Sequence, residues 1–167
     1  MKRILFSLFA LVVMTLAHAE DLDSLYAKSL VKAGTIAPEF TISTTSGESH
    51  SLSEFRGKRV VLDFWATWCG DCRHDLPKMK ELQEKYASDS LVFVGISFDV
   101  DASRLDNFVK ENNIGWLQLT ELKRMKDSQM TTLYGVQWIP SIVVVNEEGI
   151  VELSTVDITK LETLLSK

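Results

Sequence analysis

The sequence VVLDFWATWCGDC, at residues 60–72, joins an apolar run to two closely spaced cysteines. Val60 to Ala66 is apolar except for one aspartate and is rich in β-branched and aromatic residues, which predicts a buried central strand. A helix is predicted from about Gly70 to Ala87, because apolar residues recur there at helical spacing. Cys69 and Cys72, the only cysteines of the chain, therefore fall where the strand gives way to the helix.

The sequence on both sides of this stretch predicts further strands alternating with helices. Strands are expected at Phe40–Ile42, Ser49–Leu52, Leu91–Phe98, 116–119, Ile142–Val145 and Ile150–Leu153, and helices over 21–33, Ala102–Asn112, 122–133 and Ile158–Leu165. Turn-rich sequences, TTSG at 44–47 and NEEG at 146–149, join the first two and the last two of these strands and predict hairpins. The alternation favours an α/β fold with a mixed central β-sheet flanked by helices.

The beginning of the chain has the three-part arrangement of a secretory signal peptide. Lys2 and Arg3 precede the uncharged run Ile4–Leu16, and Ala17-His18-Ala19 offers a small-x-small cleavage site. A transmembrane anchor needs about 20 apolar residues, and this run is shorter. We therefore predict a signal peptide over residues 1–19, export to the periplasm, and a mature form without a membrane span.

The mature chain is predicted to comprise a lead-in segment, residues 20–33, and one domain, residues 34–167. The full chain of 167 residues is 46% hydrophobic and 25% charged, which is typical of a folded domain and excludes a disordered chain. Its formal net charge is −5, and its sequence pI of about 5.2 argues against a nucleic-acid partner, which requires a basic face. A disulfide-stapled scaffold is excluded, because it needs more than two cysteines.

The spacing of Cys69 and Cys72 suits a reversible disulfide. Positions i and i+3 on a helical turn have Cβ atoms about 5–6 Å apart, and a disulfide needs Cα atoms roughly 4.4–6.8 Å apart. The free N–H groups and positive dipole end at a helix start would also stabilise a thiolate on Cys69. This chemistry requires the sulfur of Cys69 to be accessible.

Other uses of the two cysteines are weaker alternatives. A structural disulfide across four residues would restrict the unfolded chain by only about 2 kcal/mol. A zinc site needs four ligands, and His50 and His74 are the only histidines of the mature chain. Covalent haem attachment needs a histidine directly after the second cysteine, where Arg73 stands. We favour a redox-active pair, with metal binding and a structural staple as the alternatives.

Residues 61–72 closely resemble the active-site strand and helix start of thioredoxins. The sequences APEF at 37–40, LSEFRGK at 52–58, VGIS at 94–97 and YGVQWIP at 134–140 resemble exported thioredoxin-like reductases of the TlpA/ResA group, which is related to AhpC/TSA proteins. The resemblance covers most of residues 34–165. It implies a thioredoxin fold with an N-terminal β-hairpin extension and thiol–disulfide exchange on protein substrates. No cofactor or metal is implied, and an upstream thiol donor is expected because the chain has no nucleotide or flavin motif.

The resemblance also implies roles for the residues of the pair. Cys69 is expected to be the nucleophile and Cys72 the resolving cysteine. Gly70 and Asp71, which lie between them, are expected to tune the redox properties of the pair. Asp71 stands where the family usually has proline. Its negative charge would oppose a thiolate on Cys69, which favours the oxidised form and makes the protein a stronger reductant. We therefore expect a reductase of protein disulfides.

Substrate binding is expected beside the cysteines. The resemblance implies a cis peptide before Pro140, where the backbone of Ile139 would pair with a substrate strand. Trp68 and Trp138 flank these positions and could form an apolar docking face, the alternative being that both belong to the core.

Asp63 interrupts the apolar run and matches the buried aspartate of thioredoxin, which accepts a proton from the second cysteine. A desolvated carboxyl group has a raised pKa suited to that role. One feature departs from the pattern, because Leu91–Phe98 lacks the lysine that thioredoxin offers to the aspartate. The alternative is that Asp63 faces water at a strand end.

A thiol peroxidase shares the expected fold and is the rival enzyme class. Its pattern places Thr or Ser three positions before the cysteine and Pro seven before it. Ala66 and Leu62 occupy those positions here, which argues against a peroxidase.

Overall fold

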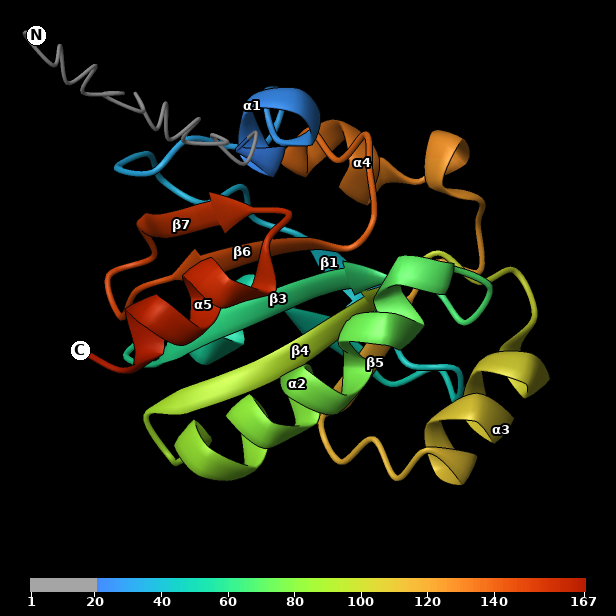
Figure 1. The fold of residues 1–167 in the computed structure, drawn as a ribbon. Helices are drawn as coiled ribbons and strands as arrows, with labels where there is room; N and C mark the ends of the chain where they lie inside the picture. Colours follow the sequence, from blue (N-terminus) through green and yellow to red (C-terminus); the bar gives the residue numbers. More distant parts are fainter. Residues whose placement is uncertain (1–20) are drawn as a thin grey trace, which may run out of the picture.

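A mixed β-sheet with helices on its faces forms the body of the protein (Figure 1). The structure, a computed structural model, describes residues 21–167, so the predicted signal peptide lies outside the described residues. The strands are β1 (Thr41–Ser43), β2 (Ser49–Ser51), β3 (Arg59–Trp65), β4 (Leu91–Ser97), β5 (Leu117–Thr120), β6 (Ser141–Val145) and β7 (Val151–Thr155). The α-helices are α1 (Leu22–Tyr26), α2 (Gly70–Tyr86), α3 (Ala102–Glu111), α4 (Gln129–Tyr134) and α5 (Ile158–Leu165), and the 3-10 helices are η1 (Leu52–Phe55) and η2 (Met125–Asp127).

The seven strands are arranged in the order β2-β1-β5-β4-β3-β6-β7. β3 pairs in parallel with β4 and antiparallel with β6, and β4 pairs in parallel with β5. The hairpin β1–β2 joins the sheet through the antiparallel pair Ser43 and Thr120. The predicted mixed sheet with an N-terminal hairpin is therefore confirmed.

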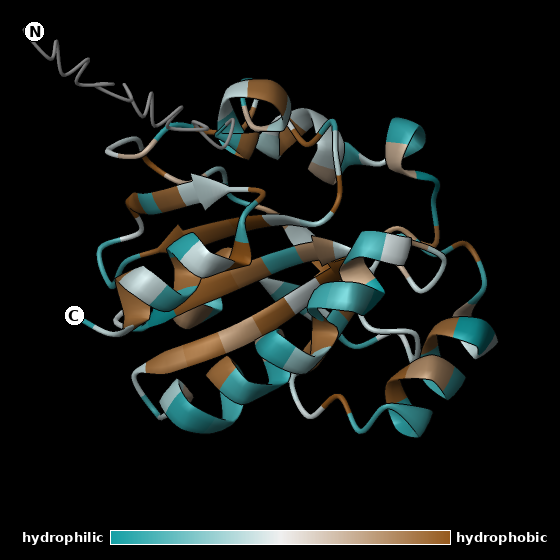
Figure 2. Ribbon diagram, viewed as in Figure 1, coloured by the Kyte–Doolittle hydropathy of each residue, from teal (hydrophilic) through white to brown (hydrophobic). Residues whose placement is uncertain are grey.

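β3 is buried on both faces and directs alternate side chains to two different helical layers. Figure 2 shows apolar residues concentrated on β3, β4 and β6. Phe64 packs against Tyr134 of α4, with ring centroids 5.3 Å apart. Asp63 and Trp65 point to the other face, where they line a small cavity with residues of α2. On that side α2 and α5 lie next to each other, joined by an ion pair between Lys78 and Glu162.

The prediction of a helix over 122–133 is wrong for the first half of that range. Leu122 has a φ of 51°, outside the right-handed helical region, and η2 is only three residues long. Ser128 is extended, and its hydroxyl accepts a hydrogen bond from the N–H of Met130. Ser128 is therefore the N-cap residue of a new helix, and α4 starts only at Gln129.

The lead-in helix predicted over 21–33 is also shorter than expected, since α1 ends at Tyr26. Beyond it the backbone forms a turn, with the N–H of Leu30 donating to the carbonyl of Ala27, and then pairs with the rest of the protein. The N–H of Val31 donates to the carbonyl of Tyr134 at 3.1 Å, and Leu30 is buried. Tertiary contacts therefore override the helical spacing of this segment.

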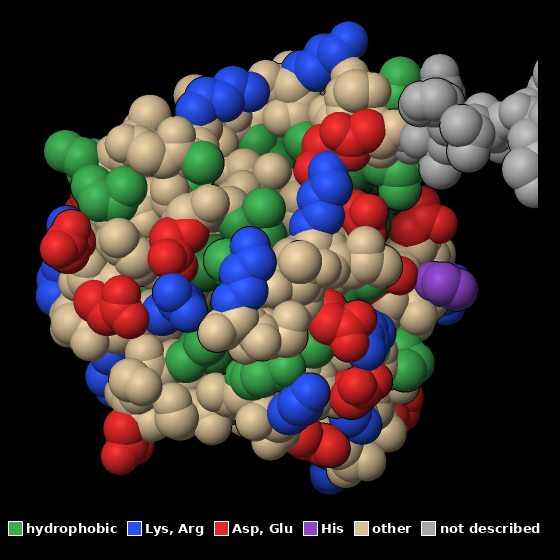
Figure 3. All heavy atoms as spheres, turned by 60° about the vertical axis from the view of Figure 1, so that its left-hand side comes forward, with side chains coloured by type: hydrophobic (Ala, Val, Ile, Leu, Met, Phe, Trp, Pro, Cys, Tyr) green, Lys and Arg blue, Asp and Glu red, His purple; other side chains and the backbone are tan. Residues whose placement is uncertain are grey.

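One face of the molecule mixes charges of both signs. On the face shown in Figure 3, basic and acidic side chains are interleaved, with hydrophobic side chains in small patches between them. Within residues 21–167, every helix falls short of the length and apolar character needed to span a membrane.

Candidate active site at the start of α2

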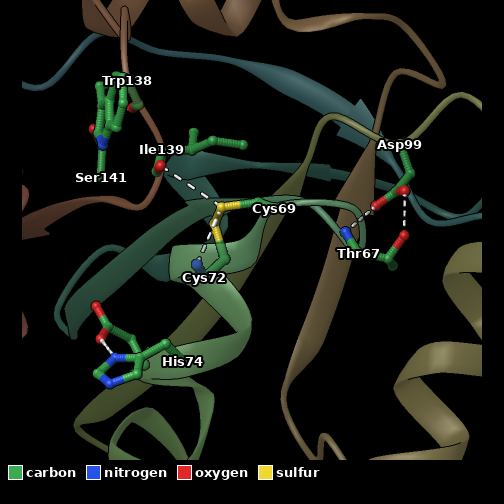
Figure 4. The surroundings of a disulfide bond; sticks show 9 residues. Thr67, Cys69, Cys72, His74, Asp99, Trp138, Ile139 and Ser141 are labelled. Carbon is green, nitrogen blue, oxygen red and sulfur yellow. Dashed lines mark hydrogen bonds and ion pairs between the residues drawn. A yellow bond between two sulfur atoms is a disulfide. The ribbon is translucent and has the colours of Figure 1, made fainter.

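Cys69 and Cys72 form a disulfide at the junction of β3 and α2, with their Cα atoms 5.3 Å apart. Cys69 is the N-cap residue of α2, and its sulfur accepts a hydrogen bond from the N–H of Cys72 at 3.1 Å (Figure 4). The sulfur therefore sits at the positive end of the helix dipole, against a backbone donor. Both features would stabilise the Cys69 thiolate once the disulfide is reduced.

The two sulfurs face different surroundings. Both cysteines are buried, with Cys69 7% exposed, which is less than its proposed chemistry led us to expect. Cys69 nevertheless lines an open pocket of about 400 Å³, whereas Cys72 lines an inner cavity of about 10 Å³. A molecule arriving from outside would reach Cys69 before Cys72.

The open pocket is mostly apolar and is built from two loops, the start of α2 and the start of η2. Its lining residues are Trp68, Cys69, Gly70, Asp71, Met125, Gln137, Trp138 and Ile139. Trp68 is 50% exposed and Trp138 is 40% exposed, so neither ring belongs to the core. Two half-exposed tryptophans beside a disulfide form a surface suited to an apolar ligand.

The loop that carries Trp138 also touches the disulfide. The Ile139–Pro140 peptide is cis, and the carbonyl oxygen of Ile139 lies 3.6 Å from Sγ of Cys69. Ser141 Oγ donates a hydrogen bond of 2.7 Å to the carbonyl of Trp138. The loop is thus held at its end, with backbone groups next to the reactive sulfur (Figure 4).

Asp63 is buried beneath the disulfide and does not face water. It is 8% exposed and shares the inner cavity with Cys72. Burial, together with the negative charge of Asp75 as the smaller cause, raises the pKa of Asp63 to about 7. Its partner on β4 is Gly95, so no lysine stands opposite it. A carboxyl group with such a pKa can accept a proton near neutral pH.

Asp75 is a member of this cavity that the sequence reasoning missed. It follows Cys72 by three residues on α2, and that spacing places the two side chains on one helix face. Its carboxylate also lies 3.0 Å from Nδ1 of His74. The i+3 spacing was the signal that could have revealed it.

A buried hydrogen-bond network that we also missed holds the strand end before the disulfide. Asp99 accepts hydrogen bonds from the N–H of Thr67 at 2.8 Å, from Thr67 Oγ1 at 2.6 Å and from Ser97 Oγ at 2.8 Å. Asp99 is only 1% exposed. The residues just before Trp68 and Cys69 are therefore fixed to the end of β4 (Figure 4).

Replacing Asp99 by alanine is expected to lower the free energy of unfolding by about 2–3 kcal/mol, because the Thr67 and Ser97 donors lose their buried acceptor. Guanidinium unfolding of the oxidised protein measures this change. Asp101→Ala is a control, since its carboxylate caps α3 at the surface and should cost about 1 kcal/mol. Equal losses in the two variants would contradict the role assigned to Asp99.

The fold and the dithiol–disulfide site define a thioredoxin-fold thiol–disulfide oxidoreductase. The chain belongs to the AhpC/TSA family, whose model matches residues 33–154. It is 32% identical to the thioredoxin-like protein YneN of Bacillus subtilis over 125 residues, covering 73% of this chain and 70% of that protein. It is 28% identical to the thiol-disulfide oxidoreductase ResA of Bacillus cereus over 150 residues, covering 89% of this chain and 84% of ResA.

Solved structures agree with this assignment. A crystal structure from Chlorobium tepidum, described as a thiol:disulfide interchange protein DsbE, superposes with a TM-score of 0.70 at 29% identity. The superposition covers 80% of this chain and 93% of that one. The thioredoxin fold and the oxidoreductase class expected from the sequence are confirmed.

Proposed function

We propose that the protein is an exported, periplasmic reductase of protein disulfides. The observation that carries the proposal is the disulfide at the start of α2, with Cys69 open to an apolar pocket and Cys72 turned inward. Export rests on the signal peptide predicted over residues 1–19, with cleavage after Ala19. The mature chain would then comprise the lead-in segment 20–33 and a domain over 34–167.

The reaction begins with the dithiol form. The Cys69 thiolate attacks one sulfur of a substrate disulfide, forms a mixed disulfide and releases the other substrate sulfur as a thiolate. Cys72, once deprotonated, attacks Sγ of Cys69, which releases the second substrate thiolate and leaves the intramolecular disulfide. Two electrons have passed to the substrate, so an external thiol donor must reduce the protein again.

Asp63 is the proposed proton acceptor for Cys72. Both side chains line the inner cavity, and its volume of about 10 Å³ is close to the least that holds one water molecule. A proton could pass from Cys72 to Asp63 through such a water. The pKa of Asp63, about 7, allows the carboxyl group to take up the proton and release it at neutral pH.

The substrate is proposed to dock along the loop that precedes β6. The backbone of Ile139, next to the cis-proline Pro140, would pair with an extended segment of the substrate. Trp68 and Trp138 would contact its apolar side chains on either side of Cys69. A polypeptide that contains a disulfide offers both the extended backbone for this pairing and the apolar side chains for these contacts.

Reduction of insulin by the dithiol form tests the proposal. The mature protein, reduced and freed of small thiols, should reduce one insulin disulfide per dithiol, and it should turn over when a thiol donor is added. A Cys69→Ser variant serves as the control. Absence of insulin reduction by the wild-type protein would refute general reductase activity.

Two rival functions have distinct outcomes. A thiol peroxidase would consume hydrogen peroxide faster than insulin disulfides. A carrier that uses the two thiolates would bind Cu(I) or Zn(II) stoichiometrically and leave insulin intact.

Asp71 is proposed to weaken the Cys69 thiolate, which favours reductase over oxidase chemistry. Asp71→Asn and Asp71→Pro are expected to lower the pKa of the Cys69 thiol, because each removes a negative charge near the sulfur. The thiolate absorbance near 240 nm, recorded against pH for the reduced proteins, measures this pKa. A pKa in either variant equal to or above the wild-type value would contradict the assignment.

A further inference from the structure

An aromatic pair links the N-terminal segment to the loop beside the disulfide. Tyr26, the last residue of α1, stacks on Trp138 with ring centroids 4.5 Å apart and ring planes 30° apart. Trp138 lines the open pocket, whereas Tyr26 is not among the lining residues. Tyr26 therefore supports the tryptophan that forms part of the pocket wall.

The short helix that carries Tyr26 is bound firmly to the body of the protein. The carboxylate of Asp23 accepts hydrogen bonds from Thr155 Oγ1 at 2.8 Å, from the N–H of Val156 at 2.8 Å and from Lys160 Nζ at 2.6 Å. These partners lie at the end of β7 and on α5. A helix of five residues is not stable alone, so these contacts fix its position.

The residues after α1 hold the other end of the same loop. Ser29 Oγ donates a hydrogen bond of 2.7 Å to the carbonyl of Gly135. Gly135 is the C-cap residue of α4 and has a left-handed backbone with a φ of 68°. A Cβ atom at Gly135 would lie 1.8 Å from the carbonyl oxygen of Ser29, so the two backbones touch. Figure 1 shows α1 and α4 beside each other. Residues 21–31 thus contact the loop 135–139 at its start and at Trp138.

We propose that Tyr26 is a positioning residue for substrate docking. Its stacking on Trp138 fixes the loop that presents the pocket wall and the backbone of Ile139 to the polypeptide around the substrate disulfide. The inference rests on the proposed reductase function. It gives a role to residues 21–31, which lie outside the family match over 33–154.

This role predicts that the size of the substrate matters. A polypeptide uses the wall formed by Trp138, whereas a small disulfide needs only access to Cys69. Loss of an aromatic pair of this kind changes a binding constant by about three- to tenfold. Tyr26→Ala should therefore raise KM for insulin by about that factor, with kcat and the pKa of Cys69 little changed. The rate with bis(2-hydroxyethyl) disulfide, a small polar disulfide without a ring to stack on Trp138, should stay at the wild-type value.

Two matched variants separate positioning from simple loss of stability. Tyr26→Phe keeps the stacked ring and should keep the wild-type KM. Leu25→Ala shortens another exposed side chain of α1, 46% exposed, and should also leave KM unchanged. The near-ultraviolet circular dichroism of the tryptophans should change in Tyr26→Ala, which leaves Trp138 unstacked, and should persist in Leu25→Ala and in Tyr26→Phe, which keeps a ring on Trp138.

The outcomes distinguish this inference from the proposed function. A wild-type protein that fails to reduce insulin refutes the reductase proposal itself. An active wild-type protein with the same KM as Tyr26→Ala overturns only the role of Tyr26. That role is likewise overturned if Leu25→Ala raises KM as much as Tyr26→Ala does, or if the KM of Tyr26→Phe is as high as that of Tyr26→Ala.

Discussion

The reduced Cys72→Ser protein is expected to accumulate a covalent complex with a disulfide substrate, because the first exchange proceeds at Cys69 and the second has lost its nucleophile. The positions of the sulfurs support this order. Cys69 lines the open pocket and Cys72 the inner cavity. Mixing the variant with insulin and separating the products on a non-reducing gel should show an adduct that dithiothreitol removes.

The opposite variant is the matched control. Cys69→Ser leaves only the enclosed thiol of Cys72, so it should form no adduct and should lose at least about a thousandfold of the reductase rate, as expected when a covalent nucleophile is removed. The same trap applied to a periplasmic extract would identify the client. An adduct formed by Cys69→Ser and absent from Cys72→Ser would reverse the assigned roles.

The central part of the fold could be predicted closely from the sequence. β3, α2 and β4 begin and end within one residue of their expected limits, because long apolar runs and a regular helical spacing leave few alternatives. The N-terminal hairpin was equally clear from its turn-rich loop. Errors arose where helical spacing competed with other contacts, as in 21–33 and 122–133.

The site was predictable where its residues are adjacent in sequence and much less so where the fold assembles them. The spacing of Cys69 and Cys72 is visible in the sequence itself. The Asp99 network and the pairing of Tyr26 with Trp138 join residues far apart in the chain, and a single sequence carries very little signal for such contacts. Asp99 closely follows a buried strand that is parallel to β3, which is the one hint that could have been used.

Asp63 is expected to make the oxidised protein less stable as the pH rises from about 4 to 7. In the folded state its pKa is about 7, whereas in the unfolded chain it is close to 3.9. Between these values the folded state holds a proton that the unfolded state has released, so the free energy of unfolding falls with rising pH and levels off above pH 7. A difference of about three pKa units corresponds to about 4 kcal/mol.

Asp63→Asn removes this titration while keeping the size of the side chain. The oxidised variant should be more stable than the wild type at pH 8, by up to about 4 kcal/mol, and close to it at pH 4. Guanidinium unfolding at several pH values measures the difference. Asp75→Asn is the matched control, since loss of its charge lowers the pKa of Asp63 in the folded state and should make the fall in stability smaller and end it at a lower pH, without abolishing it.

The Asp63→Asn protein should lose activity at neutral pH although it gains stability. If Asp63 accepts the proton of Cys72, the Asp63→Asn protein should resolve its mixed disulfide about a hundredfold more slowly near pH 7, the lower end of what general base catalysis contributes. The deficit should shrink at high pH, where hydroxide deprotonates Cys72 without help. Stopped-flow measurement of mixed-disulfide decay between pH 6 and 10 records both effects. A variant that gains stability at pH 8 and yet resolves at the wild-type rate would show that burial of Asp63 costs stability without serving the exchange.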